Sequence, residues 1–421
     1  MGQYSQQRDG MVMRQQLMDT TRQASSATIV GSSFNGPGFH KPPYLTTPIR
    51  YESLDVSRNE TFRQFLATNL SQTPTLTDII SPRLRSSYDV ILEAQRIHFN
   101  VFSELLAPYK YAILIDIAAF ANKGDPAITV GEVYLIRRLG IKLLYYCNYN
   151  ACKSRNLNYI RDVASNYSDS EVVVLLQGGG NVVGYKFHDY LRQTIFNTFS
   201  RYKIILFPQT VFMREGLSKH VAFCEKLYRQ TNFTMMLRDR QSLSLAQKHF
   251  SGMPTFYLMP DIAFQIGSIP RFISPMFDIM WLQRVDPEAP RQNVTKWPKG
   301  ITVRVEAWVN WETPKGKTTM EDSFLMQTNG MMFLQRGRVV ITDRLHGHIF
   351  CVLMNIPHVL IDTPYRKLSS YYETWTRDLE NTVLAVDADD ALAKAVGLLD
   401  KYKHSLPSIV SFMDVDENPV H

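Results

Sequence analysis

The feature that most constrains this chain is a repeated alternation of two sequence patterns. From about residue 88 onward, short runs of β-branched and aliphatic residues alternate with amphipathic stretches of helical length. The short runs predict buried strands, and the stretches between them predict helices that cover a sheet. Strands and helices that alternate in this way pair in parallel through right-handed crossovers. The sequence therefore predicts an α/β fold built on open parallel sheets.

The alternation forms two series separated by a proline-rich stretch. In the first series, strands are expected at residues 111–117, 142–147, 171–176, 203–207, 234–237 and 255–258, and helices at 127–139, 186–200, 215–230 and 240–250. The proline-rich stretch includes one strand, at 278–282, and its prolines suggest a crossing between domains. In the second series, strands are expected at 301–306, 338–342 and 358–361, and helices at 320–336, 345–354 and 388–401. We therefore expect two Rossmann-like domains, residues 56–267 and 268–405, that face each other across a ligand-binding cleft.

The two ends of the chain carry no such pattern. Residues 1–55 are polar and rich in Gly and Pro, which predicts a flexible arm, and residues 406–421 are expected to form a tail. No apolar run reaches the roughly 18 residues of a membrane span, and no signal core is visible, which favours the cytoplasm. Five Asn-x-Ser/Thr sequons favour the Golgi lumen instead, and they begin at Asn59, Asn69, Asn166, Asn232 and Asn293.

Charge and cysteine content narrow the classes of partner. The chain has 46 Lys and Arg against 39 Asp and Glu, a net charge of +7, which suits an anionic ligand. No run of like charge marks a nucleic-acid groove, so no nucleic-acid partner is expected. The cysteines show no Cys-x-x-Cys pair and no His spacing suited to zinc, so we expect core thiols with neither a metal site nor a disulfide framework. They are Cys147, Cys152, Cys224 and Cys351.

In a parallel sheet, the functional loops follow the carboxyl ends of the strands. After the first strand come Asn122, Gly124 and Asp125, which lead into a helix whose free N–H groups could hold an anion. Asp125 could instead simply cap that helix. After the strand at 234–237 comes Arg238, whose guanidinium could bind a carboxylate or phosphate, or form a surface ion pair with Asp239.

Three glycines and an asparagine, Gly178, Gly179, Gly180 and Asn181, follow the strand at 171–176. Without Cβ atoms, a ligand can approach this main chain closely and bind its N–H groups. The dinucleotide fingerprint is missed, because Val183 stands where its last glycine would fall, so no redox nucleotide cofactor is expected. A tight structural turn is the alternative interpretation.

The second series has one polar strand end of its own. Asp343, Arg344, Leu345 and His346 directly follow the apolar strand at 338–342. If Asp343 is the N-cap of the next helix, Arg344 and His346 lie on the first turn, where the helix dipole already favours an anion. This predicts an anion site with a titratable proton donor. A capped helix with one core histidine is the alternative.

In this order, the motifs resemble the polysaccharide pyruvyl transferase family. The matching elements are residues 122–125, 178–181 with Gly184, 208–209, 238–239 with Ser242, Asp261 with Ala263, and 343–348. The resemblance implies two Rossmann-like halves similar to the B-type glycosyltransferase fold. It also implies transfer of the carbon skeleton of phosphoenolpyruvate onto two sugar hydroxyls as a cyclic ketal, with release of phosphate. Residues 182–185 depart from the pattern of many members, which affects acceptor specificity.

The resemblance also implies roles for individual residues. Arg344, Leu345, His346 and Arg238 would hold the donor, helped by Asn122, Gly124, Asp125, Gly178, Gly179, Gly180 and Asn181. His188 and Gln209 are expected near the acceptor, for which a terminal galactose is one candidate. Phosphoenolpyruvate needs at least two cationic contacts for its phosphate and carboxylate. His346 would act as general acid, Arg344 would stabilise the leaving phosphate, and Asp343 or His188 would be the base. No metal and no other cofactor are required.

Two other functions use the same features. A nucleotide-sugar glycosyltransferase would bind a diphosphate through the glycine loop and Arg344, and a degenerate relative would bind glycans without catalysis. The Asp-x-Asp at residues 387–389 could suggest a metal-dependent sugar transferase. Because it opens a helical pattern, N-capping explains it better.

Overall fold

The computed structural model describes residues 84–409, apart from 119–121, 214–215, 231, 253, 287–288, 290–292, 312–318 and 364–365. The arm expected at residues 1–55 and most of the expected tail lie outside the described residues. Among the helices that are described, none is both long and apolar enough to cross a membrane.

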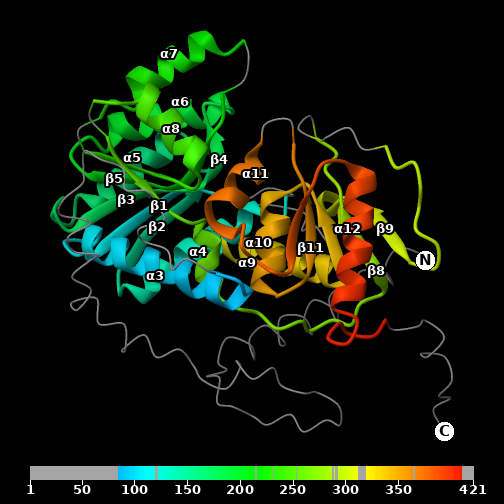
Figure 1. The fold of residues 1–421 in the computed structure, drawn as a ribbon. Coiled ribbons are helices and arrows are strands. Elements are labelled where there is room, and N and C mark those ends of the chain that lie inside the picture. The colour runs from blue at the N-terminus through cyan, green and yellow to red at the C-terminus, as the bar shows by residue number, and fades with distance from the viewer. Residues whose placement is uncertain are drawn as a thin grey trace, which may run out of the picture. The chain divides into compact units, whose positions relative to one another are not determined.

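The first half is built on a seven-stranded sheet in which every pairing is parallel (Figure 1). The strands lie in the order β2-β1-β3-β5-β6-β7, and β4 pairs with β5. Alternate residues of β3, such as Val173 and Val174, enter different apolar clusters, so the sheet is covered on both faces. The strands are β1 (Tyr111–Ile117), β2 (Lys142–Asn148), β3 (Val172–Leu176), β4 (Gly179–Val182), β5 (Lys203–Val211), β6 (Phe233–Leu237) and β7 (Thr255–Leu258).

The second half has a five-stranded parallel sheet in the order β12-β11-β10-β8-β9. Its central strand, β10, also contributes side chains to two apolar clusters, because Val340 packs in one and Val339 in the other. The two parallel sheets confirm the predicted pair of Rossmann-like α/β domains; the likeness to B-type glycosyltransferases stays a prediction. The strands are β8 (Phe277–Leu282), β9 (Val303–Glu306), β10 (Gly337–Thr342), β11 (His358–Ile361) and β12 (Thr382–Ala385).

The two sheets share one topology, which fixes where a ligand site belongs. Counted from its own first strand, each sheet begins 2-1-3, with β1 between β2 and β3 and β8 between β9 and β10. The direction of the chain connections reverses between the first and third strands of such a sheet, and ligands bind beyond the carboxyl ends of strands at that switch point. The loops after β1, β3, β8 and β10 are therefore the expected site.

Helices join the strands in both halves. The sequence predicted α4 and α6 to α10 and α12, with end shifts of a few residues, but not α3, α5 or α11. Asp387 caps α12 by accepting a hydrogen bond from the Asp390 N–H at 2.9 Å, as expected for that Asp-x-Asp. The α-helices are α3 (Ser87–Leu105), α4 (Asp125–Arg138), α5 (Ser154–Ala164), α6 (Lys186–Thr198), α7 (Ser218–Leu227), α8 (Arg240–His249), α9 (Met320–Gln335), α10 (Leu345–Leu353), α11 (Lys367–Tyr371) and α12 (Ala388–Lys401).

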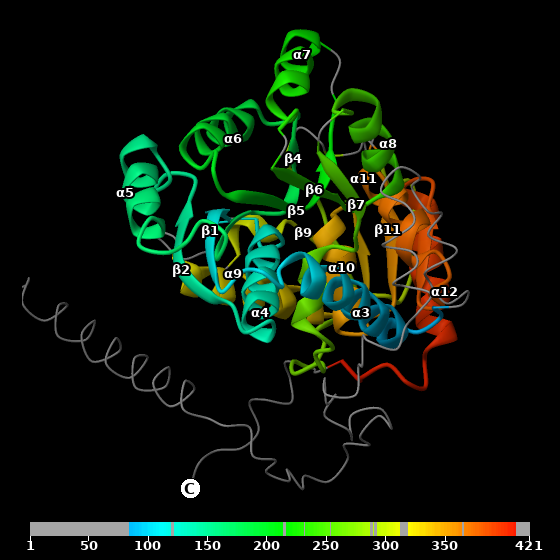
Figure 2. The same cartoon turned by 90° about the vertical axis from the view of Figure 1, so that its left-hand side faces the viewer.

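Helix α3 ties the two halves together. In Figures 1 and 2 it runs along α10 of the second half, and it also contacts the short helix η4 (Ile262–Ile266) of the first. His98 lies 2.9 Å from the Pro260 carbonyl oxygen, and at its other ring nitrogen it meets the Gln265 amide at 3.1 Å. Asn381 donates to the Ser87 hydroxyl from the second half. The predicted division at residues 267–268 thus lies in a connection spanned by a shared helix.

The prediction of four core thiols is wrong for two of them. Cys147 is the one buried residue of β2 and forms a disulfide with Cys152, with a Cα–Cα distance of 5.5 Å. The chain turns between them, because the Cys152 N–H donates to the Asn148 carbonyl at 2.9 Å. This turn brings together two cysteines whose spacing gave no signal in the sequence. Cys224 and Cys351 are free and buried, as expected.

Candidate active site

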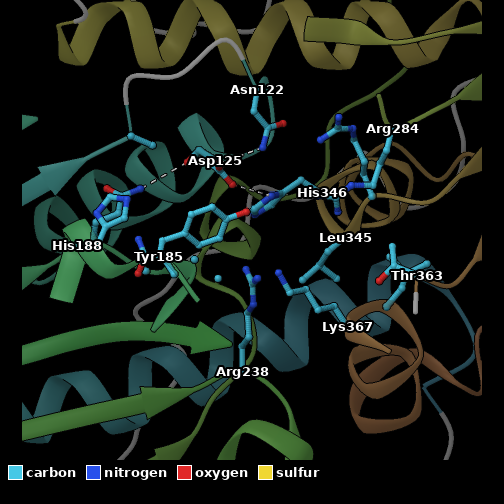
Figure 3. Close-up of a pocket in the computed structure, with 18 of the residues that line it drawn as sticks. Asn122, Asp125, Tyr185, His188, Arg238, Arg284, Leu345, His346, Thr363 and Lys367 are labelled. Atoms are coloured by element: carbon cyan, nitrogen blue, oxygen red, sulfur yellow. Dashed lines mark hydrogen bonds and ion pairs between the residues drawn. The ribbon is translucent and has the colours of Figure 1, made fainter. Parts of the chain in front are cut away.

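A pocket of about 350 Å³ lies where the two switch points meet (Figure 3). Its walls come from strand-end loops and from helices of both halves, and its size suits a small anionic ligand and one sugar unit. Figure 3 shows His188 at one side and Arg284 and Thr363 at the other. The predicted site residues that line the pocket are Asn122, Asp125, Gly178, Gly179, Gly180, Asn181, His188, Arg238, Asp343, Arg344, Leu345 and His346.

The glycine segment forms a short strand, β4, rather than the predicted loop. The Gly178 N–H donates to Glu132 at 2.8 Å, and the Asn181 N–H donates to Gln209 at 3.2 Å. The Gln209 amide in turn donates to the Gln177 carbonyl at 2.8 Å. Gln209 is fully buried and does not line the pocket. Instead of the predicted contact with the acceptor, its side chain makes the hydrogen bonds that support the glycine strand.

Arg238 lies beneath this strand and is not a surface residue. Its guanidinium donates to the Asp261 carboxylate and to the Thr210 hydroxyl, each at 2.8 Å. A Cβ added at Gly180 would lie 3.0 Å from the Arg238 Nη2 atom, so the glycine leaves room for the guanidinium at the pocket wall. The alternative of an exposed ion pair with Asp239 is therefore wrong.

The strand end after β10 differs from the prediction in its cap. The N-cap of α10 is Arg344, with no side-chain cap, whereas Asp343 accepts a hydrogen bond from the Arg284 N–H at 3.0 Å. Asp343 thus joins the ends of β10 and β8. Burial raises the pKa of Asp343 to about 6, although Arg284 and Arg344 oppose the shift.

His346 lies on the first turn of α10, as predicted, and is held between two carboxylates. Its Nδ1 atom is 3.5 Å from Asp125 and its Nε2 atom is 3.7 Å from Asp261. Gly124 does not line the pocket but backs this ring, since a Cβ there would lie 2.3 Å from the Cβ of His346. Burial would raise the pKa of Asp261, yet His346 and Arg238 hold it well below its usual value.

Sequence reasoning missed two of the pocket's cations. Arg284 follows β8 by two residues and shares the Asp286 carboxylate with Arg344, at 2.9 and 3.3 Å. Arg284 lies in the loop after the carboxyl end of β8, so applying the strand-end rule to this strand as well would have identified it. Lys367, at the start of α11, lies over the Phe212 ring at 4.2 Å and gave no such signal. The other lining residues not predicted are Asp116, Ala118, Gln177, Tyr185, Phe187, Trp308, Thr363 and Leu368.

Known proteins match the part of the chain that builds this pocket. The family model described as polysaccharide pyruvyl transferase matches residues 122–317 and 330–364, together more than half of the chain. The chain belongs to the polysaccharide pyruvyl transferase family. It is therefore a transferase of that family, as the resemblance implied. Both switch-point loops that carry the arginines lie within the matched residues.

Individual relatives agree with this membership. Pyruvyl transferase 1 of Schizosaccharomyces pombe is 32% identical over 340 residues, which cover 76% of this chain and 83% of that protein. EpsO of Bacillus subtilis, provisionally named a pyruvyl transferase, is 24% identical over 65% of this chain and 87% of its own. A solved structure of an uncharacterized Klebsiella pneumoniae protein aligns with a TM-score of 0.46 at 17% identity, covering 68% of this chain and 97% of that one.

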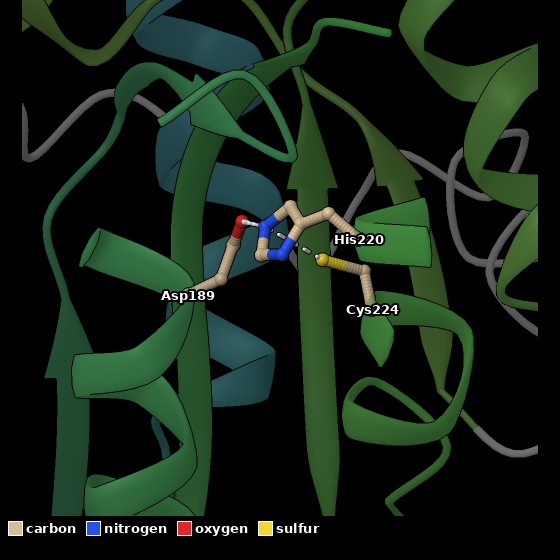
Figure 4. A group of neighbouring side chains, drawn as sticks. All are labelled: Asp189, His220 and Cys224. Carbon is tan, nitrogen blue, oxygen red and sulfur yellow. Dashed lines mark hydrogen bonds and ion pairs between the residues drawn. The ribbon is translucent and has the colours of Figure 1, made fainter. Parts of the chain in front are cut away.

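One group of this pyruvyl transferase has the geometry of metal ligands (Figure 4). Asp189, His220 and Cys224 have ligand atoms within 4.8 Å of one another, so the prediction that no histidine is suitably spaced overlooked the His220–Cys224 pair. Each carboxylate oxygen of Asp189 already accepts two hydrogen bonds. One of these four bonds comes from the cationic Arg192, at 3.0 Å. Burial also raises the pKa of the Cys224 thiol, which disfavours the thiolate. These contacts favour a structural hydrogen-bond cluster over a cation site.

Proposed function

We propose that this protein transfers the pyruvyl group of phosphoenolpyruvate to two hydroxyls of a glycan sugar, forming a cyclic ketal and releasing phosphate. One observation carries the proposal: four cationic side chains from both halves line a single pocket. They are Arg238, Arg284, Arg344 and Lys367. A donor with a phosphate at one end and a carboxylate at the other requires such spread positive charge.

The donor's two anionic groups suit different parts of this pocket. Arg284 and Arg344 lie together at the ends of β8 and β10, next to the N-terminus of α10, whose free N–H groups favour a phosphate. Arg238 lies in the other half, and the Nη2 side of its guanidinium, beside Gly180 at the pocket wall, is suited to the carboxylate. Phosphoenolpyruvate bound in this way would bridge the two halves.

The chemistry then needs a proton at the donor's methylene carbon. His346 is buried between Asp125 and Asp261, whose carboxylates lie 3.5 and 3.7 Å from its two ring nitrogens at the pocket wall. Proton transfer to C3 leaves a cationic C2, which the first sugar hydroxyl attacks. The second hydroxyl attacks C2 as phosphate leaves with the electrons of its bond, and Arg344 stabilises that charge.

The acceptor sugar would lie on the His188 side. Tyr185 and Phe187 line the pocket there, and Phe187 is 41% exposed. Aromatic rings can pack against the apolar face of a sugar ring while polar neighbours bind its hydroxyls. A galactoside is the acceptor to test first.

Thermal stability with phosphoenolpyruvate, UDP-galactose or buffer alone tests donor choice, because a ligand stabilises the folded state that binds it. We expect phosphoenolpyruvate alone to raise the melting temperature, and Arg344→Ala to abolish the rise. Arg377→Ala removes an exposed arginine outside the pocket and should keep it. Stabilisation by UDP-galactose alone would support a glycosyltransferase instead, and stabilisation by neither would favour a glycan-binding relative.

A further inference from the structure

Asp116 has a backbone conformation that strands do not normally contain. It lies near the end of β1 with a φ of +71°, and the pairing of β1 with β2 shifts register between Ile115 and Ile117. A left-handed conformation at a residue with a Cβ is costly, and such residues cluster where function requires them. The shift places the buried side chain of Asp116 at the pocket wall.

The carboxylate of Asp116 is directed at His188. Its Oδ2 atom lies 2.5 Å from the Nδ1 atom of His188, and both side chains are more than nine-tenths buried. Its other oxygen, Oδ1, is buried and makes no hydrogen bond to the described residues. A carboxylate that accepts the Nδ1 proton fixes the tautomer in which the basic lone pair is on Nε2.

Aromatic rings fix the orientation of the His188 ring. Phe187 packs against it at 4.4 Å between ring centres, and Tyr149 meets it edge-on at 5.6 Å. Tyr149 lies in the turn closed by the Cys147–Cys152 disulfide. The ring is therefore held by the Asp116 carboxylate and by aromatic packing, as a preorganised catalytic group requires, and the disulfide constrains the turn that contains Tyr149.

We propose that Asp116 and His188 form a carboxylate–histidine base that takes the proton of the acceptor hydroxyl. The inference rests on the proposed function, and it assigns acid and base to different halves. His346 gives a proton to C3 of phosphoenolpyruvate, and His188 takes one as the first sugar oxygen bonds to C2. The proton of the second hydroxyl leaves with the phosphate. The proton of the first hydroxyl, taken by His188, balances the one that His346 gave to C3.

Asp343, the other candidate base, is less suited to this step. It accepts the Arg284 N–H and lies next to Arg344, on the side of the pocket that we assign to the phosphate. The charged and titratable groups facing the Asp116–His188 pair are different: Glu132 from α4, Arg192 from α6 and Tyr149 from the turn after β2. Asp116 is thus a positioning residue, and His188 touches the substrate.

The test is chemical rescue of His188→Ala, in which added imidazole can occupy the space beside Asp116. We expect at least about a 100-fold loss of transfer rate, recovery with imidazole, and unchanged phosphoenolpyruvate binding by calorimetry. The acidic limb of the wild-type kcat/KM profile should disappear in the variant, and the rescued rate should follow the titration of imidazole. Asp116→Asn should lower kcat by a comparable factor at near-normal donor affinity.

The chain offers a matched control in His220, which pairs with Asp189 at 2.8 Å and does not line the pocket. His220→Ala should keep the acidic limb and gain nothing from imidazole, and melting curves check that every variant folds. If the wild type transfers the pyruvyl group but imidazole does not rescue His188→Ala, the inference is overturned and the proposed function stands. The same holds if Asp116→Asn keeps the full rate. If the wild type neither binds phosphoenolpyruvate nor releases phosphate from it, the proposed function fails and the inference fails with it.

Discussion

At the scale of single residues, the pocket combines opposite charges at short range. Arg344 is largely buried next to Arg284, and burial together with that neighbouring charge lowers its pKa. Asp286 and Asp343 partly compensate the two guanidinium groups. A site of this kind holds its cations ready for an anionic donor, at the cost of charge repulsion while the donor is absent.

Asp343→Asn tests this balance through pH. Because burial raises the pKa of Asp343 to about 6, its carboxyl is neutral below that pH and repels an anionic donor above it. Because the folded state raises this pKa, the stability that the neutral Asp343 carboxyl contributes is present at low pH and is lost as pH rises through about 6. The contribution of Asp343 to phosphoenolpyruvate binding should therefore become less favourable between pH 5 and 7.

The variant should bind the donor several-fold more tightly at pH 7 and show a smaller change with pH in calorimetry. The donor's own phosphate titrates identically in both proteins, so the difference between them isolates Asp343. Asp400→Asn, a change at an exposed carboxylate, serves as control. Equal affinities and equal pH slopes in wild type and Asp343→Asn would contradict this interpretation.

At the scale of elements, α3 holds the halves together through a buried neutral histidine. Burial lowers the pKa of His98 to about 4, although the Pro260 carbonyl opposes the shift. In the unfolded chain a histidine has a pKa near 6.5, so stability is full above that pH and falls as the pH drops from about 6.5 to 4. The loss attributable to His98 is about 3 kcal/mol.

His98→Gln should reduce this loss, because an amide can also donate to Pro260 and accept from Gln265. Urea unfolding at pH 7 and pH 5 measures the change. The exposed His404→Gln should leave the pH dependence as in wild type. If His98→Gln loses as much stability as wild type between these pH values, His98 is not the group that titrates.

The disulfide turn after β2 is the second element to test. Replacing both cysteines in Cys147→Ser/Cys152→Ser removes a short covalent loop, for which the chain-entropy model gives about 2 kcal/mol of stability. Because the turn carries Tyr149 against His188, the acceptor KM should rise while donor affinity stays unchanged. Reducing agent should reproduce the effect in wild type and do nothing to the double variant. An unchanged acceptor KM would show that the turn does not shape the acceptor side.

The elements also show what the sequence could predict. Runs such as residues 172–176 carry enough apolar side chains for both faces of a sheet, so the buried strands and their carboxyl-end loops were predictable. Helix α3 was missed because it comes before the first strand, outside the alternation. The disulfide and the Asp116–His188 pair depend on a turn and a register shift that only tertiary structure creates. Arg284 was overlooked because prolines after β8 suggested only a crossing between domains.

At the scale of the whole molecule, two sheets of the same topology place their switch points around one pocket. The first half supplies the glycine strand, Arg238 and the Asp116–His188 pair, and the second supplies Arg284, Arg344 and His346. In the proposed mechanism, neither half alone supplies all the donor contacts or both members of the acid–base pair. The proposed reaction therefore needs both halves, and their shared helix α3 and common apolar cluster hold them together.

The most direct measurement follows the C2 carbon of the donor. Phosphoenolpyruvate labelled with ¹³C at C2 is incubated with the protein and a galactoside, and the product is analysed by NMR together with released phosphate. We predict that the label appears as a ketal carbon bonded to two sugar oxygens, with one phosphate released per ketal. Arg344→Ala should give neither. Label that stays in phosphoenolpyruvate, or that appears only as free pyruvate while the galactoside is unchanged, would contradict pyruvyl transfer to the sugar.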